Sequence, residues 1–185
     1  MNKKVVILSF SGRKAGNCAA ISDFIERFYM RTNVLSFIVD NKSFPACGGC
    51  DYECLKQGVR CPVLTEDQRK IMEAITKSDL VYFIVPNYCG YPCANYFAFN
   101  ERSVGYFNMD RALMEKYMAV KKRFIVVSNS EENFAEAMQQ QTNEQADILY
   151  LKTRKYQKQS VAGDLLTSEA AKADLQAFLA LESTL

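Results

Sequence analysis

The stretch that decides the fold is Val5-Val6-Ile7-Leu8-Ser9-Phe10, which runs directly into Ser11-Gly12-Arg13-Lys14-Ala15-Gly16-Asn17-Cys18. The first six residues are almost all apolar and rich in β-branched side chains, which is typical of a strand buried on both faces of a parallel sheet. The polar segment contains two glycines and leads into apolar residues spaced i, i+3, i+4 and i+7: Ile21, Phe24, Ile25 and Phe28. This spacing predicts an amphipathic helix, and Asn17 is the expected N-cap.

The same alternation of strand and helix continues along the chain. Four further strands are predicted at 34–39, 80–85, 124–127 and 148–151. Helices are predicted after the capping box Thr65 to Gln68, over 132–146 and over 167–181. Pro86 is expected to end the third strand, because proline cannot donate a hydrogen bond to a central ladder.

Alternating strands and helices predict an α/β fold with helices on both faces of a parallel sheet. Right-handed crossovers and five strands favour a flavodoxin-like doubly wound sheet of order 2-1-3-4-5. Ligands of such sheets lie outside the carboxyl ends of the strands. We therefore expect three loops, 9–18, 86–93 and 128–130, to meet there.

Composition narrows the functional classes. The 185 residues suit one domain spanning 1–185, and a net charge of +2 without a basic stripe argues against nucleic acid. The basic stretches 121–123 and 152–158 adjoin apolar runs and are expected to be solvated strand ends. No apolar segment has transmembrane length, so we expect no membrane partner. Seven cysteines, an odd number, argue against a full disulfide framework and for a reducing cytoplasm.

The absence of histidine removes Ser–His and Cys–His nucleophile pairs and every His-ligated metal site. The first loop has instead the features of an anion site. It follows a strand and opens a helix, where backbone N–H groups and the helix dipole favour a phosphate. Ser9 and Ser11 offer hydroxyls, Arg13 can pair with a phosphate, and Gly16 allows close backbone approach. An ordinary solvated loop is the competing interpretation.

Several segments together resemble one protein family. Ser-x-Ser-x-Arg-x-x-Gly-Asn, beginning at Ser9, is similar to the phosphate loop of the NADPH-dependent FMN reductases, which are flavodoxin-like. Cys18 stands where that family often has Ser or Thr. Further matching segments, in the same order, are Pro45-Ala46-Cys47-Gly48-Gly49-Cys50, Pro86-Asn87-Tyr88-Cys89-Gly90 and Phe99-Asn100-Glu101-Arg102.

The resemblance implies bound FMN, NAD(P)H as the electron donor, a flavin, quinone or similar small molecule as the acceptor, and a homodimer. The cofactor-binding residues it implies are Ser9, Ser11, Arg13, Gly16, Asn17, Cys18, Pro86, Asn87, Tyr88, Cys89, Gly90 and Ser128.

The segment after the third strand also fits a flavin ring on chemical grounds. Tyr88 and Tyr91 can stack on a flat ring, while Asn87 and Gly90 can present polar and bare backbone edges. No side-chain acid or base is needed, so no catalytic residue is named. A place in the core, a lid or a dimer interface is the expected alternative for Tyr91 and the expectation for the aromatic residues that follow it: Tyr96, Phe97 and Phe99.

Four cysteines form a compact set with spacing Cys-x2-Cys-x3-Cys-x6-Cys, namely Cys47, Cys50, Cys54 and Cys61. Three interpretations stay open: a [4Fe–4S] cluster, as in iron–sulfur relatives of the family, a structural zinc ion, or free thiols. The iron–sulfur relatives usually have two residues between the second and third cysteine, and here there are three. Cys89 and Cys93 are expected to be buried small hydrophobes.

Three functions compete. The first is an FMN-containing NAD(P)H-dependent oxidoreductase. The second is a non-enzymatic electron carrier, which could hold a [4Fe–4S] cluster on the four cysteines, although the near-neutral charge argues against a carrier. The third is a phosphate-ligand module without flavin. The insert 94–122 is rich in aromatic residues and is expected to carry acceptor specificity and dimer contacts.

Overall fold

A computed structural model describes residues 3–31, 33–42, 44–56, 59, 61–107, 110–129 and 133–181. The elements it contains are β1 (Val5–Ser9), α1 (Asn17–Phe28), β2 (Val34–Ile38), η1 (Glu53–Leu55), α2 (Glu66–Thr76), β3 (Leu80–Tyr88), β4 (Tyr91–Pro92), α3 (Ala94–Phe107), α4 (Arg111–Ala119), β5 (Lys121–Ser128), α5 (Phe134–Gln139), β6 (Asp147–Lys152), η2 (Thr153–Tyr156), η3 (Leu165–Thr167) and α6 (Glu169–Ala180).

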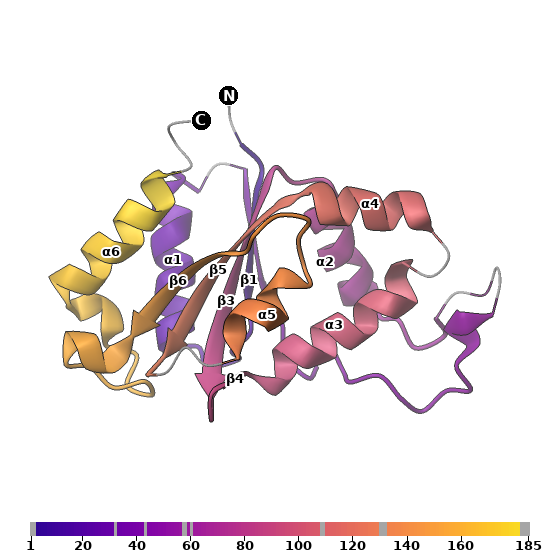
Figure 1. Cartoon of the computed structure of the whole chain (residues 1–185), viewed down its shortest axis with the longest axis horizontal. Coiled ribbons are helices and arrows are strands. Elements are labelled where there is room, and N and C mark those ends of the chain that lie inside the picture. The colour runs from indigo at the N-terminus through magenta and orange to yellow at the C-terminus, as the bar shows by residue number, and fades with distance from the viewer. Residues whose placement is uncertain are drawn as a thin grey trace.

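The sheet has the order β2-β1-β3-β5-β6, and all of these neighbours are parallel. This is the predicted order 2-1-3-4-5, with one addition. The two-residue strand β4 folds back antiparallel on the end of β3. All the parallel strands point the same way, so their carboxyl ends lie together at the lower edge in Figure 1.

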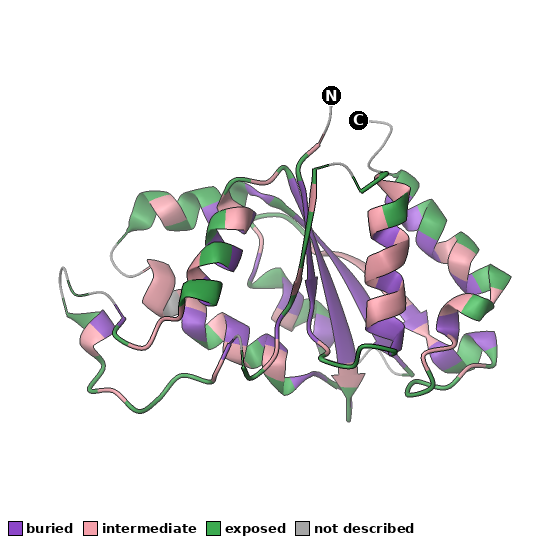
Figure 2. Cartoon of the chain, turned by 180° about the vertical axis from the view of Figure 1, so that it is seen from behind, coloured by how far each residue is buried: buried purple, intermediate pink, exposed green. Residues whose placement is uncertain are grey.

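Helices cover both faces of the sheet, as predicted. One face packs against α1 and α6, which stand side by side in Figure 1, and the other packs against α2, α3, α4 and α5. Successive residues of β1 alternate between the two layers, so Val5 and Ile7 face α1 while Val6 and Leu8 face α2. The central strands are therefore buried on both sides, whereas the edge strand β2 is largely exposed (Figure 2).

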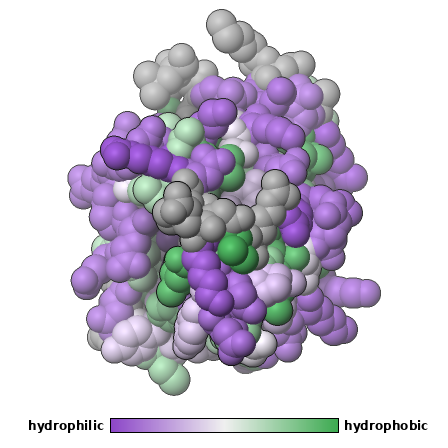
Figure 3. Space-filling view, turned by 90° about the vertical axis from the view of Figure 1, so that its right-hand side faces the viewer, coloured by the Kyte–Doolittle hydropathy of each residue, from purple (hydrophilic) through white to green (hydrophobic). Residues whose placement is uncertain are grey.

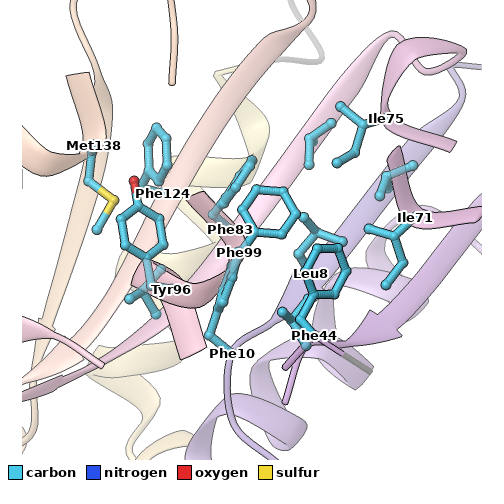
Figure 4. Packing of buried hydrophobic residues seen from close by; sticks show 14 of the residues in the cluster. Leu8, Phe10, Phe44, Ile71, Ile75, Phe83, Tyr96, Phe99, Phe124 and Met138 are labelled. Atoms are coloured by element: carbon cyan, nitrogen blue, oxygen red, sulfur yellow. The ribbon is translucent and has the colours of Figure 1, made fainter. Parts of the chain in front are cut away.

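Aromatic rings fill the layer beneath α3. Phe10 stacks on Phe83 with ring centroids 5.7 Å apart, and both rings meet Phe99 edge-on (Figure 4). Tyr96 is fully buried beside them, and its hydroxyl donates to the Ala137 carbonyl at 2.9 Å. The expectation of core packing therefore holds for Tyr96 and Phe99. Each buried ring contributes about 1.5–3 kcal/mol, so this cluster fixes α3 against the sheet.

Pro86 does not end the third strand, contrary to the sequence prediction, because β3 continues to Tyr88. The alternating hydrogen-bond direction explains this. The Ile84 carbonyl accepts from the Phe10 N–H, so the backbone groups of Ile84 point toward β1. Those of Pro86, two residues later, point the same way, but β1 has already ended there. Its missing N–H costs no ladder bond there, and its carbonyl accepts from the Cys93 N–H at 3.1 Å.

The helix predicted over 132–146 is wrong in length, since α5 spans only Phe134–Gln139. The Gln139 side chain bonds to the Glu144 carbonyl and accepts from the Ala146 N–H at 2.7 Å. These side-chain bonds to the backbone stabilise a turn where propensity favours helix. Glu132, the first residue of the predicted helix, lies outside the described residues.

The basic stretch 121–123 is a solvated strand end only at Lys121, so the prediction is wrong for the next two residues. Lys122 is 3% exposed and Arg123 is fully buried. The Lys122 ammonium donates to the Tyr117 and Val120 carbonyls at the end of α4, where a helix C-terminus favours a cation. Arg123 donates to the Asp147 carboxylate and to the Phe178 carbonyl, each at 2.5 Å. Both cations therefore attach helices to the sheet.

The helices among the described residues are all too short or too polar to cross a membrane.

Candidate functional site

The carboxyl ends of β1, β3 and β5 carry two adjoining hollows that share Tyr88. The first, of about 330 Å³, is lined by Phe10, Ser11, Gly12, Arg13, Tyr88, Cys93, Ala94 and Asn95. The second, of about 310 Å³, is lined by Asn87, Tyr88, Cys89, Gly90, Ser128, Asn129 and Ser160. The three loops predicted to meet at this edge therefore do meet. Ser130, the last residue of the third loop, lies outside the described residues.

The loop after β1 has features expected of an anion site. Gly16 is the N-cap of α1 and makes no side-chain cap, so the first N–H groups of the helix face the loop. Ser11 and Arg13 line the first hollow, and the exposed Arg13 side chain can swing toward a ligand. Asn17 is the first helical residue rather than the predicted N-cap, because its buried side chain bonds elsewhere in the chain.

Ser9 supplies an observation that points to a ligand. It is 3% exposed, and its hydroxyl has no hydrogen-bond partner among the described residues. Strand alternation places it on the face of β1 that carries Val5 and Ile7, next to the beginning of α1. A buried hydroxyl without a partner costs about 1–3 kcal/mol, and a phosphate oxygen held at the helix N-terminus would satisfy it.

The Cys18 thiol is a weaker hydrogen-bond donor than a hydroxyl. Its side chain is buried beneath the loop, and burial, reinforced by nearby Cys93, raises the pKa of Cys18 to about 12. The thiol is therefore neutral at any physiological pH. What Cys18 offers a ligand is its backbone N–H in the first turn of α1.

The segment after β3 forms a tight hairpin. Tyr88 pairs with Tyr91, and the two residues between them, Cys89 and Gly90, have φ values of 54° and 82°, as in a type I′ turn. The Asn87 amide oxygen accepts from the Gly90 N–H at 3.0 Å and fixes the turn. Cys89 is exposed, so the prediction of a buried residue is wrong there, whereas Cys93 is buried as predicted.

Two half-exposed aromatic rings flank this turn. Tyr88 and Tyr91 are 52% and 54% exposed, although their backbones are fixed by the hairpin. Phe97 on α3, 42% exposed, packs edge-on against Tyr96. Of these rings, Tyr88 lines both hollows, and a partly exposed aromatic side chain on a fixed backbone beside a hollow is typical of a site for a flat ligand.

The end of β1 and the start of α3 are joined through one carbonyl group. The Phe10 oxygen accepts from the Asn95 amide at 3.2 Å and from the Cys93 thiol at 3.4 Å. These bonds set the start of α3 against the end of β1, which fixes the width of the first hollow. Asn95 was not predicted as a site residue, because only the fold brings it to Phe10.

The loop after β5 is positioned by η2. The Asn129 amide oxygen accepts from the Thr153 hydroxyl at 2.7 Å and from the Arg154 N–H at 3.0 Å. Ser128 is 4% exposed and lines the second hollow, in agreement with its predicted place. Ser160 lines the same hollow from the segment after η2 and was missed by the sequence analysis.

The cysteine-rich loop lies apart from these hollows and is attached to α3. The Arg102 side chain, 3% exposed, donates to the Pro45 and Ala46 carbonyls at 2.8 Å each and contacts the Cys61 sulfur at 3.8 Å. The Glu101 carboxylate accepts from the Cys47 N–H at 3.2 Å. Figure 3 views the molecule from the right-hand side of Figure 1, the side that carries the cysteine-rich loop, and its surface is mostly hydrophilic with small hydrophobic patches.

The four clustered cysteines differ in exposure. Cys54 and Cys61 are buried, Cys50 is intermediate and Cys47 is exposed. Burial, followed by the three other thiols of the loop, raises the pKa of Cys54. Within the described part of the chain, no group of three or more cysteine or acidic side chains could hold a metal ion as placed. A metal centre on these cysteines stays a prediction.

Comparisons with known proteins identify solved structures that share the fold of this chain. No protein-family model matches the sequence, and no curated protein matches it. Among solved structures, the Trp repressor binding protein of Bacillus subtilis is 14% identical, with 95% of this chain and 97% of that chain covered and a TM-score of 0.60. FerB, a flavoenzyme NAD(P)H:(acceptor) oxidoreductase of Paracoccus denitrificans, is 13% identical, with 95% and 94% covered and a TM-score of 0.57.

A putative quinone reductase of Klebsiella pneumoniae is 14% identical, with 96% of this chain and 85% of that chain covered and a TM-score of 0.55. The protein has the flavodoxin-like fold. The strand order and these likenesses agree. The resemblance found in the sequence is therefore confirmed at the level of the flavodoxin-like fold.

Proposed function

We propose that the protein binds FMN and is an NAD(P)H-dependent oxidoreductase that passes electrons to a flavin, a quinone or a similar small acceptor. The observation that carries this proposal is the pair of hollows joined at Tyr88. One opens on the loop that precedes α1, and the other opens on the hairpin that follows β3. Together they provide one place for an anion and one for a flat ring at the sheet edge where such folds bind ligands.

The residues present fit the two ends of FMN. The phosphate would lie on the N–H groups of the loop and first turn of α1, with the Ser9 and Ser11 hydroxyls and Arg13 around it. The ring would lie at 86–90 and Ser128, where the hairpin supplies backbone groups and Tyr88 supplies a flat surface. When bound, FMN supplies the ability to accept electrons from a nicotinamide and release them to an acceptor.

The protein's own contribution is binding and orientation. The hairpin and the Phe10 carbonyl hold the two hollows at a fixed separation, so a long ligand meets a preformed site. The half-exposed Tyr88 and Tyr91 leave this edge open, which gives a donor and an acceptor access in turn. No side-chain acid or base is required of the protein for this exchange.

Steady-state kinetics test the enzymatic part of the proposal. The FMN-loaded protein is mixed with NADH or NADPH and with a soluble quinone or free flavin, and nicotinamide absorbance is followed. Multiple turnovers per flavin support the oxidoreductase. Reduction of the flavin only by a protein donor, with no turnover of NADH or NADPH, would favour the electron carrier instead.

A further inference from the structure

The segment 157–165 runs from the end of η2 to the first residue of η3 and returns to the beginning of α1, where the Asn17 side chain bonds to it. The Asn17 amide nitrogen donates to the Gln159 and Ser160 carbonyls at 3.2 Å each, and its oxygen accepts from the Leu165 N–H at 2.9 Å. Asn17 itself is 3% exposed. One buried amide thus makes three hydrogen bonds across more than 140 residues of sequence.

The same segment also touches the phosphate loop directly. Gly163 has a φ of +72°, and a Cβ added there would lie 2.1 Å from the Ala15 carbonyl oxygen and 3.5 Å from the Gly16 Cα. Only glycine allows this approach of two backbones. The segment therefore packs on the residues whose N–H groups open the anion site.

The middle of the segment reaches the other half of the site. Ser160 lines the second hollow, opposite the hairpin residues Tyr88 to Gly90. The segment consequently connects the phosphate end and the ring end, although Gln157 to Ala162 are mostly exposed and have no regular structure. Such a segment keeps one conformation only where contacts offset its conformational entropy, and Asn17 and Gly163 supply those contacts.

We propose that segment 157–165 is a fourth segment lining the FMN site, in addition to the loops 9–18, 86–93 and 128–130. Asn17 is then a positioning residue, because it couples this segment to the loop after β1. The proposal rests on the proposed function, since FMN is the ligand concerned. It assigns to the Asn17 side chain a role in ordering the site, separate from any contact of its backbone N–H with phosphate. It also assigns Ser160 a direct contact with the ligand.

Titration of FMN into the apoprotein, followed by quenching of flavin fluorescence, tests this coupling. We expect Asn17→Ala and Gly163→Ala each to weaken FMN binding about tenfold or more, because each releases the segment without changing the net charge. Gly49→Ala is the matched control. Gly49 has a φ of +73°, but a Cβ there meets nothing within 4 Å, so its affinity should stay within about twofold of the wild type.

Hydrogen exchange of the apoprotein provides a readout that needs no flavin. In Asn17→Ala, the Leu165 amide and its neighbours in 157–165 should exchange faster, while the β5 amides keep their protection. In the wild type, FMN should slow exchange in 157–165. Ser160→Ala, which leaves Asn17 and Gly163 unchanged, should weaken FMN binding about threefold or more and covers the case in which the other variants fail to fold.

The outcomes separate the two claims. If the wild type binds FMN and both Asn17→Ala and Gly163→Ala bind it equally well despite faster exchange in 157–165, the segment is only structural and the coupling is overturned. Unchanged exchange in Asn17→Ala would overturn the role of Asn17 by itself. If the wild-type protein binds no FMN, the proposed function fails, whatever the exchange of the segment shows.

Discussion

At the scale of single residues, Arg13 is the side chain that we propose to bind the FMN phosphate. Its side chain is exposed, and it lines the first hollow beside Ser11. We expect Arg13→Ala to weaken FMN binding by about tenfold to a hundredfold, because charge-assisted hydrogen bonds contribute about 1.5–3 kcal/mol. Lys14→Ala removes the same charge from the exposed neighbour and should change affinity much less. Equal losses in both variants would show a general charge effect instead of a specific contact.

Lys122 gives a prediction on the pH dependence of stability. Burial lowers the pKa of Lys122 from its ordinary value of 10.5 to about 7. Between these values the unfolded chain binds one proton more than the folded chain, so this lysine makes the free energy of unfolding rise as pH increases. Its contribution is at most about 1.4 kcal/mol per pH unit. Urea denaturation gives the free energy of unfolding at each pH between 7 and 10. In Lys122→Met this free energy should rise less steeply with pH than in the wild type, and an equal rise would contradict the assignment.

At the scale of elements, Arg102 is the link between α3 and the cysteine-rich loop. Removing its side chain leaves two carbonyl groups, Pro45 and Ala46, without their donor. Arg102→Leu should lower the free energy of unfolding by about 2–4 kcal/mol and make the Cys54 and Cys61 thiols react faster with an aromatic disulfide. Arg111→Ala is the control, because that side chain is 87% exposed and its ion pair with Glu115 lies on the surface.

The sequence predicts the helices and strands correctly where the spacing of apolar residues reflects which face of the element is buried. The apolar strands and the amphipathic α1 have periodicities that follow directly from packing, and the capping box of Thr65 and Gln68 is present as predicted. The failures have a different cause. The helix at 132–146 was cut short by side-chain bonds from Gln139, and β3 passes Pro86 because β1 ends first. The first depends on particular side-chain bonds and the second on where a neighbouring strand ends, and neither is visible in apolar periodicity or helix propensity.

At the scale of the whole molecule, the sequence predicts where the candidate site lies but not all of the residues that line it. Because parallel strands end at one edge, the sequence alone predicted that loops 9–18, 86–93 and 128–130 would meet. It did not predict Ser160 or the role of Asn17. Asparagine before a helix usually indicates an N-cap, and nothing local in the sequence indicates that this amide bonds to a segment more than 140 residues away.

The assembly of the molecule is a further prediction at this scale. We propose a homodimer formed through the insert 94–122, where Phe97 on α3 and Met114 on α4 are 42% and 46% exposed. Light scattering should then give twice the chain mass of 21.0 kDa. Phe97→Asp should shift the protein toward the monomer because a charge would be buried in the interface. A monomeric wild type at micromolar concentration would contradict this proposal.

The central claim is that this fold binds FMN, and the visible absorption spectrum of the purified protein tests it most directly. The protein is purified without oxygen, its spectrum is recorded, and any released chromophore is identified after heating. We predict the two-banded spectrum of an oxidised flavin after exposure to air, with FMN released in a ratio of one per chain. A colourless protein that takes up no added FMN would contradict the account and leave only the fold.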